Sequence, residues 1–226
     1  MRSLILVSAC CLLACGTEHT RITFPLECSS QSSGLTTDSG WSVTLTKAVA
    51  HVSTARFFEG KVLISQSSPW WRSLLVSEAY AHPGHYIPGA AMAEVLTPLE
   101  LDLLKSEPTP WGTADGITGD YGSLELGYEG AGLEVEGTAT RAGQTVTFTG
   151  SFMPPKPLEG IRFEREMTTT RGVVSLRFDL SVVLSRVDFS QVGTGATPLD
   201  PMSPAFNGLA RGVDDTSGYL VTWMEN

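Results

Sequence analysis

The residues best suited to chemistry lie in residues 79–86, which read Ala-Tyr-Ala-His-Pro-Gly-His-Tyr. Pro83 and Gly84 suit the central positions of a type II turn, because proline fixes φ near about −65° and glycine accepts a positive φ. His82 and His85 would then flank the turn, with Cα atoms less than about 7 Å apart. Two imidazoles at that separation can bind one metal ion, with bonds of about 2.0–2.1 Å for zinc.

His51 is the candidate for a third metal ligand. It has the same strand parity as Val43, Leu45 and Val49, which predicts an inward-facing imidazole, although Lys47 shares this parity. Sites rich in imidazole suit Cu(II), Zn(II) or Ni(II), so copper or zinc is the cofactor that this pattern predicts. Further ligands could come from two carboxylates and a phenol: Glu59, Glu78 and Tyr86.

A surface turn without metal explains the same residues, because the turn alone fixes the spacing of its histidines. The chain has no Gly-x-Ser-x-Gly elbow, no phosphate-binding glycine loop and no Cys-x-x-Cys pair. His82 or His85 could act as a base, but no matched nucleophile is evident. We therefore predict no catalytic residues, and keep a hydrolase of unrecognised type as an alternative.

Residues 1–14 have the form of a secretory leader. Arg2 is followed by an apolar run over residues 4–14, which is too short to span a membrane. The run ends in Leu12-Leu13-Ala14-Cys15, which resembles the lipobox of bacterial lipoproteins. The resemblance implies lipidation of Cys15 and cleavage just before it. Gly16 follows the cysteine, and by the same resemblance favours the outer membrane. The alternatives are an ordinary secretory peptide and a second box that ends at Cys10.

The composition limits the partners. The 226 residues include 15 Lys plus Arg and 24 Asp plus Glu, for a net charge of −9. Nucleic-acid binding requires concentrated positive charge, so we expect no nucleic-acid partner. Cys10 and Cys11 would leave with the leader and Cys15 would carry lipid. Cys28 would then be the single remaining thiol, for which we expect a buried, passive role.

Alternating apolar and polar residues predict an all-β domain. The clearest alternation covers residues 174–184, and a hairpin is expected over residues 133–152. One or two short helices are expected, one over residues 90–96 and one from Ser203 to Gly212. The predicted fold is a single antiparallel β-sandwich over residues 41–226, with a barrel-like arrangement as second choice. Residues 15–40 would form a polar tether with one possible strand, residues 21–26.

These features predict a lipid-anchored protein of the cell envelope, facing the periplasm or the cell surface, with a non-catalytic binding or structural role. Its partners would be the membrane, through the lipid on Cys15, and an envelope protein or polymer. The alternative function is a copper- or zinc-binding module that uses His82, His85 and His51.

Overall fold

The computed structural model describes residues 19–60, 89–105, 107–193, 195 and 197–225. Two helices, α1 (Leu180–Ser185) and α2 (Pro204–Val213), accompany the strands. Neither has the length and hydropathy of a membrane span. The strands are β1 (Arg21–Gln31), β2 (Ser42–Glu59), β3 (Ala91–Val95), β4 (Leu99–Asp102), β5 (Thr109–Ile117), β6 (Gly119–Arg141), β7 (Gln144–Phe152), β8 (Leu158–Met167), β9 (Gly172–Asp179), β10 (Thr197–Pro198) and β11 (Tyr219–Glu225).

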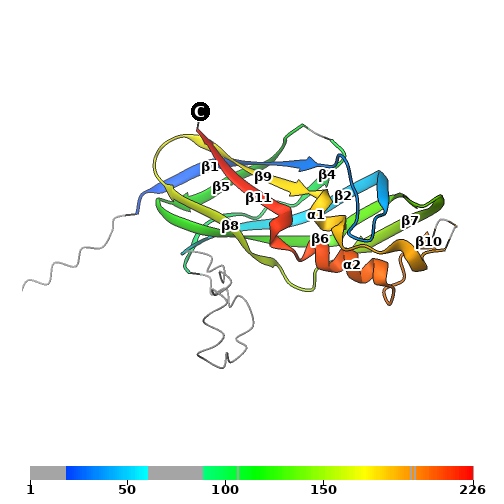
Figure 1. The fold of residues 1–226 in the computed structure, drawn as a ribbon. Coiled ribbons are helices and arrows are strands. Elements are labelled where there is room, and N and C mark those ends of the chain that lie inside the picture. Colours follow the sequence, from blue (N-terminus) through cyan, green and yellow to red (C-terminus); the bar gives the residue numbers. More distant parts are fainter. Residues whose placement is uncertain (1–18, 61–88, 106, 194, 196, 226) are drawn as a thin grey trace, which may run out of the picture.

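All eleven strands belong to one hydrogen-bonded sheet, so the predicted all-β class with short helices is confirmed. The order is β10-β7-β6-β2-β3-β5-β1-β9-β11, with β4 paired to β2 and β8 paired to β6. Most neighbours are antiparallel, but β1 runs parallel to β9 and β10 parallel to β7. The strand expected within residues 21–26 is longer than predicted and lies inside the sheet between β5 and β9 (Figure 1).

Strand β6 has different partners along its length. Its first part pairs with β8 from Gly119 to Leu126, and its last part pairs with β7 from Leu133 to Arg141. Between these parts, residues 129–132 lie opposite His51 alone. Gly130 and Gly132 have φ of 57° and 68°, values that suit glycine and permit such a bulge.

One half of the sheet curls until its edge strands face each other. Eight strands follow the curve from β8 through β6, β2, β3, β5, β1 and β9 to β11. Within the described residues no β-pairing joins β8 to β11, and Arg165 forms an ion pair with Glu225 across the seam. Aromatic rings fill the interior, including an edge-on contact of 5.5 Å between the ring centroids of Phe57 and Phe163.

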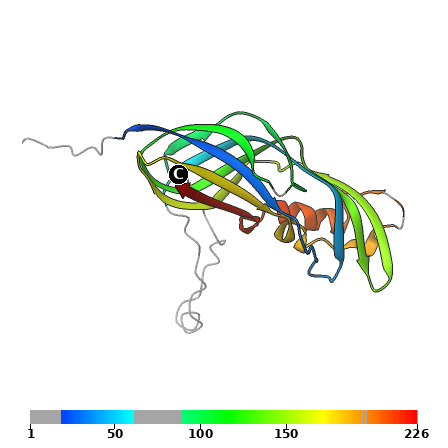
Figure 2. The ribbon, with the colours of Figure 1, turned by 90° about the horizontal axis from the view of Figure 1, so that it is seen from above.

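The two helices cover the other half of the body (Figures 1 and 2). The predicted helix start at Ser203 is confirmed, because the Ser203 hydroxyl accepts from the Phe206 amide at 3.1 Å and Pro204 is the first helical residue. The Phe206 ring packs edge-on against Phe152 of β7, with centroids 5.9 Å apart. The expected hairpin is confirmed as β6 and β7, joined at Ala142-Gly143, where both φ values are positive.

Two predicted elements are wrong. Residues 174–184 do not form one strand, because Asp179 caps α1 by accepting a hydrogen bond from the Ser181 amide at 2.9 Å. The apolar residues after Asp179 therefore point inward from a helix, which their alternation in sequence did not indicate. Residues 90–96 do not form a helix, because β3 pairs there with β2 and β5.

Candidate functional site

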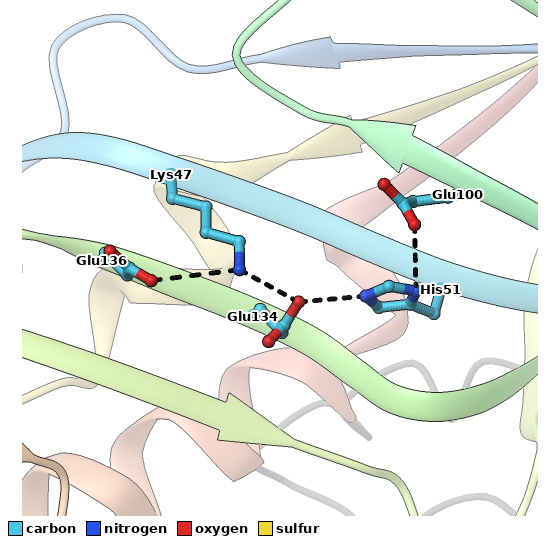
Figure 3. Close-up of polar contacts among 5 residues, drawn as sticks. All are labelled: Lys47, His51, Glu100, Glu134 and Glu136. Atoms are coloured by element: carbon cyan, nitrogen blue, oxygen red, sulfur yellow. Dashed lines mark hydrogen bonds and ion pairs between the residues drawn. The ribbon is translucent and has the colours of Figure 1, made fainter.

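A network of charged side chains crosses three neighbouring strands (Figure 3). His51 Nε2 lies 3.0 Å from Glu134 Oε2, and His51 Nδ1 lies 3.9 Å from Glu100 Oε2. Lys47 Nζ lies 3.2 Å from Glu134 Oε2 and 3.9 Å from Glu136 Oε1. Strand β2 supplies the lysine and histidine, β6 supplies two glutamates, and β4 supplies Glu100. The network thus connects β4, β2 and β6.

His51 does not face the core, which corrects the inward orientation predicted from its parity. The register of β2 against β6 shifts between Leu45 and Lys47, and such a shift moves every later side chain to the opposite face. Val43 is buried before the shift, whereas Ala50 and Val52 are buried after it. His51 therefore shares the outer face with Lys47, and its side chain is 22% exposed.

Glu134 is the electrostatic centre of the network. The hydrogen bond from His51 is the main cause that lowers the pKa of Glu134, and Lys47 lowers it further, while burial acts in the opposite direction. The carboxyl group therefore stays ionised under neutral conditions. An ionised carboxylate only accepts hydrogen bonds, so His51 Nε2 carries the shared proton.

This network is not arranged as a metal site. The two ring nitrogens of His51 face different carboxylates, so Glu100 and Glu134 do not converge with one nitrogen on a single point. In the described ranges, no group of three or more His, Cys, Asp or Glu side chains could hold a metal ion. His82, His85 and Cys15 lie outside the described residues. A shared metal site with His51 therefore stays a prediction, as does lipidation of Cys15.

A groove of about 440 Å³ adjoins the network. Glu134, Glu136 and Thr149 line it from β6 and β7, whereas Pro201 and Phe206 line it from the segment that leads into α2 and from α2 itself. One wall carries negative charge and the other is apolar, which suits a ligand with a cationic group next to an apolar one. Sequence reasoning missed this groove, because Glu134 and Glu136 have the alternation of a solvent-exposed strand face.

Cys28 is buried, as expected from the sequence. Its side chain is fully enclosed, and burial raises the pKa of the thiol to about 12. The thiolate, which is the reactive form, is therefore scarce at neutral pH. A buried tyrosine pair lies in the same core, with the hydroxyls of Tyr128 and Tyr219 2.9 Å apart. Both tyrosines are buried, as Cys28 is.

His19 lies at the end of the curled half, beside the last residue of β2 and the first residue of β3. Its Nδ1 lies 2.6 Å from the carbonyl oxygen of Thr118. Glu59, Asp120 and Glu166 line the same surface cleft as His19. The sequence placed this histidine in the tether, and only the pairing of β1 with β5 brings it beside these carboxylates.

Comparisons with known proteins give no family. No family model matches the sequence, and no curated protein matches it significantly. Among solved structures, MbnP from Methylosinus trichosporium superposes with a TM-score of 0.38 and 12% sequence identity, over 91% of this chain and 99% of that chain. A similarity at this level does not establish a common fold, so no property of MbnP is carried over to this chain.

The lowered pKa of Glu134 predicts a pH-dependent contribution to stability. A carboxyl group with a lowered pKa in the folded state stabilises the fold above its ordinary value of 4.5, and this contribution is lost as the pH falls through the folded-state pKa. Glu134→Gln should therefore unfold more easily than the wild type in urea at pH 7, and the difference should be smaller near pH 3, below the ordinary value of 4.5. Glu129→Gln, at an exposed glutamate of the same strand, is the control and should show little effect at either pH. A Glu134→Gln difference of equal size at both pH values would contradict this role.

Proposed function

We propose that this protein is a lipid-anchored component of the bacterial outer membrane that binds a partner through the groove beside Glu134 and Glu136. The lipobox-like leader supports the anchor. Cys15 precedes Arg21, the first residue of β1, by six residues, a length of chain that spans at most about 22 Å. The end of the body at which β1 begins would therefore lie close to the membrane surface.

The observation that carries this proposal is the position of the groove at the other end of the body. Strand β6 runs from Gly119, beside the cleft of His19, to Glu134 and Glu136 in the groove. Without the bulged residues, this stretch corresponds to roughly 35 Å of strand between Gly119 and Glu134. The start of β1 and the elements that line the groove, β7 and α2, lie at opposite ends of the body (Figure 1). Such a body holds its binding surface away from the lipid, facing the periplasm or the cell surface.

The chemistry of the groove favours a protein partner that presents a basic side chain beside an apolar one. Glu134 is ionised, and the half-exposed Glu136 forms one long contact among the described residues, of 3.9 Å, with Lys47. Pro201 is exposed opposite these carboxylates. The role is non-catalytic, because the groove offers an oriented charge and an apolar wall for recognition.

The anchor is tested by the fate of Cys15. The wild-type protein should fractionate with membranes and incorporate labelled fatty acid, because three acyl chains hold a protein far more firmly than one. Cys15→Ala should appear in the soluble fraction without label. Cys28→Ala is the matched control and should remain lipidated and membrane-bound. Soluble wild-type protein, or label retained in Cys15→Ala, would contradict the anchor.

The groove is tested by site-specific photo-crosslinking in cells. A photoreactive residue at position 201, inside the groove, should give one dominant protein adduct, whereas the same residue at position 44, on the exposed face of β2, should not. Adding Glu136→Lys to the chain that carries the probe at position 201 should reduce the adduct severalfold, because it reverses the charge of the groove. Equal adducts at both positions would contradict a specific groove.

Metal binding is a second proposed function, and the position of His19 favours it. His85 lies four residues before Gly89, a distance of at most about 14 Å. Gly89 packs so tightly on Glu59 that an added Cβ would lie 2.4 Å from the Glu59 carbonyl oxygen. His51 is eight residues back along β2, about 26 Å from Glu59. His82 and His85 would therefore reach His19 and Glu59 more easily than they would reach His51.

Calorimetric titration with Cu(II) and Zn(II) tests this second function. The wild-type protein should bind one ion with micromolar affinity or better, and the double variant His82→Ala/His85→Ala should lose this binding. His19→Ala should weaken binding about tenfold or more, as expected for loss of one ligand, while His51→Ala should retain it. Binding that survives in the double variant would contradict a site on these histidines. Loss of binding in His51→Ala would instead restore the predicted three-histidine set.

A further inference from the structure

A second cleft, at the end of the body where β1 begins, is rich in hydrogen-bond donors. Two arginines and the indole of Trp223 line this cleft, together with consecutive threonine hydroxyls of the turn between β8 and β9. Its lining includes no carboxylate side chain, although the whole chain has a net charge of −9. The donor-bearing residues are Arg21, Thr23, Thr168, Thr169, Thr170, Arg171 and Trp223.

Trp223 contributes an unsatisfied donor. Its Nε1 is buried and has no hydrogen-bond partner in the part of the chain that the structure describes. The backbone at Gly172 packs directly on the indole, because an added Cβ there would lie 2.4 Å from Trp223 Cζ2. The ring also lies edge-on to Phe24, with centroids 6.0 Å apart. The indole is therefore fixed in place as a wall of the cleft, and its buried N–H without an acceptor carries a cost in stability.

The two arginines differ in whether a neighbouring carboxylate neutralises their charge. Arg21 binds Asp115 through two hydrogen bonds, of 2.8 Å and 3.2 Å, so a neighbouring carboxylate neutralises it. Arg171 is exposed and forms no ion pair with any residue of the described ranges. A guanidinium group has five N–H donors in a planar fork that matches phosphate and carboxylate oxygens. The N–H donors of the Arg171 guanidinium group are therefore available to a bound anion.

We propose that this cleft binds a phosphate-type oxyanion, held by the guanidinium of Arg171 and the threonine hydroxyls of the turn, beside the indole of Trp223. Its volume of about 210 Å³ is below the range of roughly 300–1,000 Å³ found for drug-sized ligands, and suits a single anionic group. The phosphate could be free in solution or belong to a lipid headgroup. This inference goes beyond the proposed function and does not depend on lipidation of Cys15 or on the groove at Glu134.

The test is a titration of the purified, detergent-solubilised protein with inorganic phosphate, followed by calorimetry and by indole N–H resonances in NMR spectra. The wild-type protein should bind one phosphate saturably. The indole peak that is absent from the Trp223→Phe spectrum should shift as the site fills, because this ring lines the cleft. Absence of saturable binding, or binding that leaves this peak unchanged, would overturn the proposal.

Variants separate a specific site from general attraction. Arg171→Gln should weaken phosphate binding about tenfold or more, because it removes the charge-assisted hydrogen bonds of the fork. Arg177→Gln, at another exposed arginine six residues further along the chain, should bind as the wild type does. Arg171 is exposed, so its variant should fold normally even if Trp223→Phe does not. Equal losses in both arginine variants would show general electrostatic attraction and overturn the site.

The source of the phosphate is identified with vesicles. The unlipidated Cys15→Ala chain is mixed with phosphatidylglycerol vesicles, with and without Arg171→Gln. Vesicle binding that falls with Arg171→Gln would identify a lipid headgroup as the ligand. Saturable binding of inorganic phosphate without Arg171-dependent vesicle binding would identify a free oxyanion. Both results support the cleft as an oxyanion site, and absence of both overturns it.

Discussion

Strand β6 pairs first with β8 and then with β7, and the bulge at residues 129–132 lies between these two pairings. Four residues of β6 lie opposite one residue of β2, so the sheet can change its curvature without losing hydrogen bonds on either side. Gly130 and Gly132 accept the positive φ values that the bulge requires. The curled half and the helix-covered half are therefore parts of one sheet, and both sites depend on how that sheet turns at His51.

The two ends of this sheet carry different chemistry. At one end, Arg171 and the threonines of the turn between β8 and β9 line a small cleft. At the other end, Glu134 and Glu136 face an apolar wall. This separation follows from the long strands, because a residue pair at one end of β6 cannot contact the cleft at the other. A short-stranded sheet with the same composition would bring these opposite charges together, and they would neutralise each other.

Local sequence patterns predicted the strands and helices better than they predicted which face of the sheet each side chain occupies. The β-rich class, the β6–β7 hairpin and the cap of α2 at Ser203 all follow from signals within a few residues. The helix α1 was missed, because residues 174–184 alternate between apolar and polar as a strand does. The cap at Asp179 ends the strand within this alternation. The orientation of His51 was missed because a register shift is set by the partner strand, which the sequence of β2 does not display. The two clefts could not be predicted for the same reason, since each combines residues from segments far apart in the chain.

The position of β1 inside the sheet has a mechanical consequence. The strand is hydrogen-bonded to β5 on one side and to β9 on the other, and it emerges at its own N-terminal end. Force applied at that end, as an anchor in a moving membrane would apply it, acts along the strand and parallel to its neighbours. From Arg21 to Pro25 the hydrogen bonds to β5 carry this load in shear, and from Leu26 onward those to β9 share it. An anchor attached at this end would therefore pull on a strand inside the sheet, whereas an edge strand such as β11 would peel away under the same pull.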